Sequence, residues 1–257
     1  ETTVKSELSL SAVTFTGLAS GTNVDLIGNG SLANAAFSYG YAAAATASTL
    51  DIMDGVTAGN ITETGTGLLT STINSTGAAN TIGTLGIAAS VTALNINATT
   101  DLTTGAITSA AVTTLTITGS GDVDIDAGAL DDDTDVIDAS ALTGDLEILT
   151  GNVADNSGVA ADLTVTTGSG NDDVDLTGLD AVDEINITLG AGDDIVFIDQ
   201  AIQATSTTSP GDVLAGGAGT DTLSAATATL DSHATTTTVS GFEKINITDE
   251  HSGSLDV

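Results

Sequence analysis

The sequence lacks the residues that small secreted domains most often use as cross-links and core anchors. Cysteine and tryptophan are absent, and two Tyr, four Phe and one Pro are spread over 257 residues. Without cysteine the chain has no disulfides, no zinc–thiolate sites and no thiol catalysis. With so few aromatic side chains, we expect a different kind of cross-link to stabilise the fold.

Positive charge is almost absent as well. Lys5 and Lys244 stand against 35 acidic residues, and the formal net charge is -33. No cationic surface is available to neutralise phosphates, so nucleic acid is excluded as a partner. The chain has no apolar run of 18 residues, so we expect no membrane span. It begins at Glu1 without a signal peptide, which suggests a mature chain or a fragment of a longer one.

High net charge with few aromatics is also typical of disordered proteins. Leu, Ile, Val and Phe make up about a quarter of the residues, slightly more than the roughly 20% below which disorder is expected. Self-repulsion would favour the unfolded chain, whereas a divalent cation bound between carboxylates would favour the folded one. We therefore expect folding to depend on metal.

Short segments alternate aliphatic and polar residues with a period of two, the pattern of β-strands. They are LNINA from Leu94, LTITG from Leu115, VDIDA from Val123, LEILT from Leu146, LTVTT from Leu163, INITL from Ile185 and INITD from Ile245. Similar turns follow several of them, as if each coil of a solenoid reused one corner. The fold class expected is all-β, an elongated right-handed parallel β-solenoid (β-helix or β-roll) with calcium-binding turns.

This pattern divides the chain into two portions. Residues 92–257 are expected to form a calcium-binding parallel β-solenoid. Residues 1–91 keep the alternation in pieces but lack the glycine-aspartate corners, so we expect a β-rich N-terminal portion that is either solenoid or sandwich. YAAAATAST, residues 41–49, is the one stretch there that favours a short helix.

Glycine and aspartate recur in a fixed order before aliphatic residues. GGAGTDTLS (216–224) fits the nonapeptide G-G-x-G-x-D-x-U-x of calcium-binding β-helices. TGSGNDDVD (167–175) and LGAGDDIVF (189–197) keep most of it, and TTSPGDVLA (207–215) keeps Asp212 nine residues before Asp221. Glycine allows a tight turn to present carbonyl oxygens, and aspartate adds carboxylate oxygens. We expect Ca²⁺ at these corners; the alternative is that the Gly-Asp pairs only form turns.

Two further acidic segments give weaker signals. TGSGDVDID (118–126) has Val123 where the aspartate should stand, which leaves Asp122 or Asp124 as displaced ligands. DDDTDVID (131–138) resembles the start of an EF-hand, but Val136 replaces the required glycine and the twelfth position has no Glu. An EF-hand is therefore excluded. A calcium site in a long loop, with ligands Asp131, Asp133 and Asp135, and a solvated acidic turn both stay open.

The sequence offers little material for catalysis. His233 and His251 lie in polar segments far from other candidate members of a catalytic triad. Paired carboxylates could form a glycosidase site, but turns already account for many of them and few aromatics are present to stack on sugars. We expect no enzymatic activity.

The nonapeptides resemble those of the repeat-in-toxin family. The segments VIDASALTGDLEI (136–148), TDTLSAATATL (220–230) and VSGFEKINI (239–247) look more specifically like the lattice-forming region of bacterial surface-layer proteins. The resemblance implies type I secretion, folding on external Ca²⁺ and assembly on the cell surface. By position it implies side-chain ligands Asp172, Asp194, Asp212 and Asp221, and backbone ligands Gly168, Gly170, Gly190, Gly192, Gly217 and Gly219.

These observations favour an extracellular structural protein that binds several Ca²⁺ ions and assembles with copies of itself into a cell-surface layer or a fibre. Contact with surface polysaccharide would require regions outside this chain. The alternatives are a repeat-in-toxin adhesin or biofilm-matrix segment that binds another surface, and an accessory module of a polysaccharide-modifying enzyme.

Overall fold

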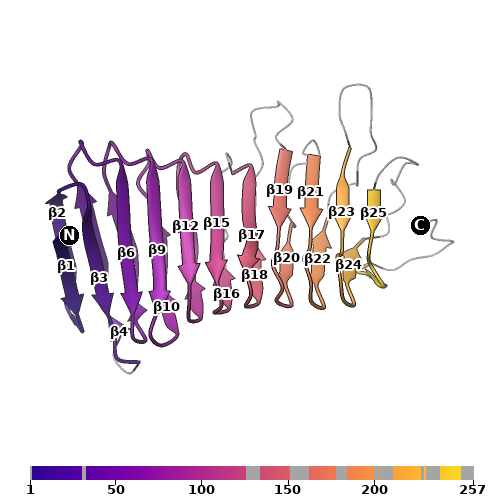
Figure 1. Ribbon diagram of the computed structural model, residues 1–257, viewed down its shortest axis with the longest axis horizontal. Helices are drawn as coiled ribbons and strands as arrows, with labels where there is room; N and C mark the ends of the chain where they lie inside the picture. The colour runs from indigo at the N-terminus through magenta and orange to yellow at the C-terminus, as the bar shows by residue number, and fades with distance from the viewer. Residues whose placement is uncertain are drawn as a thin grey trace.

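Strands of successive coils lie side by side along the length of the protein (Figure 1) and form a parallel β-solenoid. The structure is a computed structural model, which describes residues 2–30, 33–125, 134–150, 162–177, 184–199, 202, 211–226, 229 and 238–249. The coils follow one another in chain order from the first strand to the last. The expected all-β, parallel-solenoid class is confirmed.

Three sheets form the walls. Sheet A contains β1 (Thr2–Glu7), β3 (Thr22–Ile27), β6 (Ala47–Met53), β9 (Thr70–Thr76), β12 (Ala93–Ala98), β15 (Thr114–Gly119), β17 (Val136–Leu142), β19 (Asp162–Thr166), β21 (Glu184–Thr188), β23 (Val213–Ala215) and β25 (Thr238–Ser240). Sheet C contains β4 (Ala33–Asn34), β7 (Thr57–Ala58), β10 (Asn80–Ile82), β13 (Leu102–Thr104), β16 (Val123–Ile125), β18 (Leu146–Leu149), β20 (Asp173–Asp175), β22 (Ile195–Ile198), β24 (Thr222–Ala225) and β26 (Lys244–Ile247). Sheet B contains β2 (Val13–Leu18), β5 (Phe37–Tyr41), β8 (Ile61–Thr64), β11 (Leu85–Gly86) and β14 (Ile107–Thr108).

The cross-section changes along the rod. Sheets A and C extend almost from end to end, whereas the last strand of sheet B is β14. The earlier coils therefore have three walls, and the described part of the later coils has two. Strands on both sides of residue 91 belong to one sheet, because β9 and β12 pair in register over six residues.

Period-two alternation places one set of side chains inside the rod. In sheet A one inward column consists of Val24, Leu50, Ile73, Ile96 and Ile117, all fully buried. Identical positions of successive coils thus stack to form a continuous thin core. All seven segments expected to be strands contain one.

The expected short helix at residues 41–49 is wrong. Tyr41 ends β5, residues 42–46 form a turn, and β6 begins at Ala47. Nine alanine-rich residues are too few to form a stable helix by propensity alone. The turn instead buries Tyr41 and Ala45 against the core.

The three-walled part encloses a polar group that the sequence did not indicate. Glu63 on β8 is buried, and its Oε1 atom accepts hydrogen bonds from the hydroxyls of Tyr39 (3.2 Å), Ser48 and Ser71 (2.9 Å). The Ala88 N–H donates to Oε2 at 3.2 Å. Four donors compensate the buried carboxylate, so it links sheets A and B from inside.

The N-terminal strand packs within its own chain, since β1 pairs with β3 in parallel over six residues. None of the described residues belongs to a helix long and apolar enough to span a membrane.

Candidate metal-binding corner

The three best glycine-aspartate motifs lie directly above one another. Each forms the corner at which the chain passes from sheet A to sheet C, between β19 and β20, β21 and β22, and β23 and β24. Register is continuous across these coils, and Ala191 and Ala218 form a parallel bridge within the corners. Residues separated by 22 and 27 positions in the sequence are thus brought to one edge of the rod.

The glycines are required by the stacking itself. A Cβ on Gly170 would lie 2.2 Å from the carbonyl oxygen of Gly144, and one on Gly192 would lie 1.9 Å from that of Gly170. A Cβ on Gly219 would lie 1.8 Å from the Gly192 oxygen. Gly192 and Gly219 also have φ angles of 140° and 147°. The corners contact one another backbone to backbone, a steric reason for glycine that is independent of any ion.

A second glycine column runs beside the first. Cβ atoms on Gly168, Gly190 and Gly217 would lie 1.8, 1.7 and 2.2 Å from the carbonyl oxygens of Leu142, Gly168 and Gly190. All six glycines named from the resemblance therefore lie in this corner. The carbonyl oxygens of Gly168 and Gly190 accept hydrogen bonds from the Ala191 and Ala218 N–H groups of the next coil.

The aspartates of the motifs occupy a core position. Asp172, Asp194 and Asp221 are 1%, 0% and 0% exposed. Register places them in one column with Asn80, Leu102, Val123 and Leu146 of earlier coils. We call Asp172, Asp194 and Asp221 the inner column. A column that holds one amide and three aliphatic side chains in these earlier coils thus becomes acidic in the later ones.

Each inner carboxylate accepts a backbone hydrogen bond through its Oδ1 atom. The N–H groups of Leu146, Asp172 and Asp194 donate to the Oδ1 atoms of Asp172 (2.9 Å), Asp194 (2.8 Å) and Asp221 (3.0 Å). The three Oδ2 atoms are buried and have no hydrogen-bond partner. An unpaired buried charge is costly unless a proton or a cation compensates it.

Burial also changes the acidity of this column. It raises the pKa of Asp194 from 3.8 to about 6, and the negative charges of Asp172 and Asp221 contribute to the increase. Burial likewise raises the pKa of Asp172, while the neighbouring Thr167 hydroxyl and the hydrogen bond from the Leu146 N–H lower it. Without a counter-ion, the folded corner therefore disfavours the carboxylate form.

A second, exposed column precedes the inner one by a single residue. The side chains of Asp101, Asp122, Asp145, Asn171 and Asp193 each accept a hydrogen bond from the backbone N–H at the same position in the next coil, over 2.6 to 3.1 Å. We call these residues the outer column. Most of it escaped sequence reasoning, although an alignment of the coils by their strands would have revealed it.

Asp212 lies at the opposite corner of the rod. It is buried, immediately precedes β23, and accepts the Ile185 N–H through Oδ1 at 3.0 Å. The nine residues between Asp212 and Asp221 therefore correspond to half a coil. Glu184, in the preceding coil, is buried close to this corner, and no motif in the sequence indicated it.

The remaining acidic candidates lie elsewhere. Val123 occupies the aspartate position of its coil and is buried. Asp122 belongs to the outer column, and Asp124 lies on β16 in sheet C. The structure therefore does not bring these two aspartates into the inner column. Asp135 is exposed just before β17. Asp131, Asp133, His233 and His251 lie outside the described residues.

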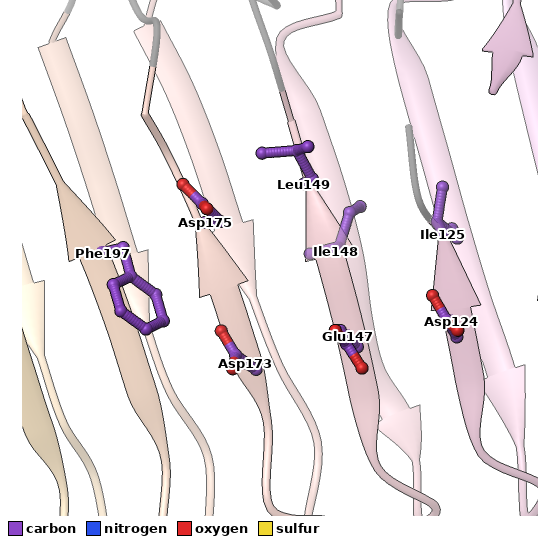
Figure 2. A pocket seen from close by; sticks show the side chains of 8 residues that line it. All are labelled: Asp124, Ile125, Glu147, Ile148, Leu149, Asp173, Asp175 and Phe197. Carbon is purple, nitrogen blue, oxygen red and sulfur yellow. The ribbon is translucent and has the colours of Figure 1, made fainter. Parts of the chain in front are cut away.

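Carboxylates also line a depression of about 330 Å³ on the outer face of sheet C (Figure 2). Asp124, Glu147 and Asp173 form one row across β16, β18 and β20, with Asp175 beside them and Phe197 on the next strand. Burial raises the pKa of Asp173, and the charges of Glu147 and Asp175 add to this. This face therefore repels other acidic surfaces.

Within the described parts of the chain, no three acidic or histidine side chains converge on one point as a metal cluster would. The corner supplies one buried carboxylate per coil, arranged as a line. An ion bound there would need backbone carbonyl oxygens to complete its coordination. Such a set of hard oxygen ligands, without cysteine, suits Ca²⁺ better than a transition metal.

Comparison with models of protein families, with curated proteins and with solved structures finds no match for this chain. The resemblance to the repeat-in-toxin family therefore depends on the corner motifs alone.

Proposed function

We propose that this chain is a secreted structural protein that assembles at the cell surface and whose later coils are held together by Ca²⁺. The observation that carries the calcium part is the inner column, where three fully buried carboxylate oxygens have no partner. A dication at the corner would compensate these charges in the folded state only. Calcium binding and folding are then the same event.

The expected energies make this linkage strong. Extracellular calcium modules bind at about 10⁻⁴ to 10⁻³ M, and calcium at tenfold its dissociation constant stabilises the folded state by about 1.4 kcal/mol per site. Three sites would contribute roughly 4 kcal/mol, similar to the net stability of a marginal domain. A chain with a net charge of -33 would fold only where external calcium is abundant.

Assembly, rather than binding of a small molecule, is supported by the shape of the molecule. The rod presents extended sheets, and four carboxylates are among the residues that line the depression on sheet C. Copies that stack in a regular way would form a layer or a fibre. The function of such a protein would be mechanical, as a continuous layer or fibre.

Electron microscopy and circular dichroism of the purified chain, with millimolar Ca²⁺ and with a chelator, test both parts. We expect ordered arrays or filaments in Ca²⁺, and loss of both assembly and β-structure in the chelator. Mg²⁺ at the same concentration is the control for ionic strength. A spectrum and an unfolding midpoint unchanged by the chelator would refute the calcium part, and dispersed monomers in Ca²⁺ would refute assembly.

One observation favours the adhesin alternative. The outward face of sheet A is uncharged across β9, β12 and β15, where the outward residues are Thr70, Thr72, Asn74, Ala93, Asn95, Asn97, Thr114, Thr116 and Thr118. In so acidic a protein, this neutral hydrogen-bonding face could lie on another surface. Monomers that bind a surface only in the presence of Ca²⁺ would support this function over self-assembly.

A further inference from the structure

The column that contains the inner aspartates also contains an amide. Asn80 is the first residue of β10, and register aligns it with Leu102 of the next coil and, further along, with Leu146 and the inner column. Its side chain is buried, with 1% exposed. An early coil thus has asparagine at the buried corner position where the later coils have aspartate.

Amide and carboxylate hold the preceding coil in the same way through Oδ1. The Val56 N–H donates to Oδ1 of Asn80 at 2.8 Å. The N–H groups of Leu146, Asp172 and Asp194 make the equivalent bonds to the inner column. In every case the donor occupies the same position in the preceding coil. This half of the contact therefore does not distinguish the two side chains.

The other terminal atom of the side chain does distinguish them. Nδ2 of Asn80 donates to the carbonyl oxygens of Ile52 (3.2 Å) and Thr76 (3.3 Å) and to the hydroxyl oxygen of Ser75 (2.9 Å). The two carbonyl groups can only accept hydrogen bonds. A carboxylate oxygen in the place of Nδ2 would face these acceptors without a hydrogen to share, which is unfavourable in a buried site unless a cation lies between them.

Backbone carbonyl groups equivalent to that of Ile52 precede each inner aspartate. Ile52 belongs to a column of sheet A that continues through Ser75, Ala98 and Gly119 to Leu142, and the second glycine column stacks on Leu142. The equivalent residues in the coils before Asp172, Asp194 and Asp221 are Leu142, Gly168 and Gly190. The inner Oδ2 atoms, which replace Nδ2, have no hydrogen-bond partner. The later corners thus repeat the surroundings of Asn80 without the hydrogens that satisfy them.

We propose that the amide of Asn80 does permanently what Ca²⁺ does in the later coils, so that asparagine or aspartate at this position sets the metal requirement of a coil. This inference rests on the calcium binding proposed above and names the feature that regulates it. An amide closes the corner with its own hydrogens, whereas a carboxylate closes it only around a cation. One terminal group, NH₂ or oxygen, separates a permanent corner from one that responds to calcium.

Asn80→Asp transfers the metal requirement to a coil that lacks it. In chelator we expect a lower thermal midpoint and hydrogen exchange at the Val56 N–H that is faster by about tenfold or more, because the variant buries an unpaired charge. Millimolar Ca²⁺ should restore both quantities to the parent values. Mg²⁺ at the same concentration should not, because it dehydrates reluctantly and demands a stricter geometry.

Two control variants separate the position of the charge from its presence. Asn80→Leu gives this coil the side chain that Leu102 has at the same position, and any loss of stability should be the same in Ca²⁺ and in chelator. Thr81→Asp adds the carboxylate one residue later, at an exposed position of β10, and should also show no added response to Ca²⁺. Asn80→Asp that is equally destabilised in Ca²⁺ and in chelator, or unaffected in chelator, would overturn the inference.

The reverse exchange tests the later coils. Asp172→Asn/Asp194→Asn/Asp221→Asn gives each inner position an amide. We expect the thermal midpoint of this variant in chelator, and the exchange protection of β20 and β22, to match those of the parent chain in Ca²⁺. A calcium-dependent parent whose triple variant still needs Ca²⁺ would reject the role given to the amide and leave calcium binding intact. A parent chain indifferent to Ca²⁺ would instead reject the proposed calcium binding.

Discussion

At Asp194, burial raises the pKa of the carboxyl group, whereas the backbone hydrogen bond that it accepts lowers this pKa. The backbone geometry of the corner gives its Oδ1 atom a donor, the Asp172 N–H. Its Oδ2 atom and those of Asp172 and Asp221 are buried without one. The same position is aliphatic in three earlier coils, so a hydrophobic side chain is compatible with the solenoid, and it is Asn80 in another, where Oδ1 accepts the Val56 N–H. The fold therefore accounts for the hydrogen bond through Oδ1, and the proposed calcium would account for the buried Oδ2 atoms.

Asp194→Asn separates the two effects, because asparagine keeps an acceptor oxygen but loses the charge. In chelator we expect it to raise the free energy of unfolding by roughly 1–3 kcal/mol, since a costly buried charge is removed. In calcium titrations followed by circular dichroism, it should raise the midpoint roughly tenfold. Asp193→Asn, in the exposed outer column, is the control and should change neither quantity appreciably. A loss of stability in chelator would contradict this account.

The raised pKa of Asp194 also predicts how stability depends on pH without metal. Its folded value of about 6 exceeds the ordinary 3.8, so between about pH 4 and 6 the folded state binds more protons than the unfolded state. The free energy of unfolding should then fall as the pH rises through this window and level off above it. Thermal unfolding in chelator should show this slope, and Asp194→Asn should reduce it. An unchanged slope in the variant would assign the pH dependence to other groups.

The elements of the fold were predictable to the extent that they depend on local pattern. Alternation located strands such as β12 and β21, and glycine spacing located the corners between sheets A and C. Sheet B was not predictable, because strands as short as β11 and β14 contain too few residues to show the alternation of polar and apolar residues that marks a strand. The buried network around Glu63 and the inner location of Asp212 depend on which coils become neighbours, and no local signal encodes that.

The glycine corners give a prediction at the same scale. Gly192→Ala would place a Cβ 1.9 Å from the Gly170 carbonyl oxygen, at a φ of 140°. We expect it to destabilise the folded state by more than about 2 kcal/mol even in saturating Ca²⁺, because the backbones of adjacent coils must separate. Gly59→Ala is the matched control, since the nearest atom to its Cβ would be 3.9 Å away. Equal effects in denaturant unfolding would show that close stacking does not explain the glycines.

For the whole molecule, the acidic column of the later coils would, on the proposed calcium binding, divide the rod into regions of different metal dependence. The earlier coils are filled mainly by aliphatic and aromatic side chains, including the ring contacts between Phe15, Phe37, Tyr39 and Tyr41. Buried polar groups such as Glu63 and Asn80 have hydrogen-bond partners there. The described part of the later coils has two walls and carries the inner column. In a solenoid, each coil is stabilised mainly by its neighbours, so one region can unfold while the other persists.

Hydrogen exchange during calcium removal should reveal this division. We expect amides of β19 to β24 to lose protection first, with the N–H groups of Asp172 and Asp194 as direct reporters because they donate to inner carboxylates. Amides of β6, β9 and β12 should stay protected at the same chelator concentration, since their columns contain no unpaired charge. Loss of protection throughout the chain at one calcium concentration would mean that the rod unfolds as a single unit. The metal would then stabilise the whole solenoid through coupling between coils, and the acidic column would not mark a boundary.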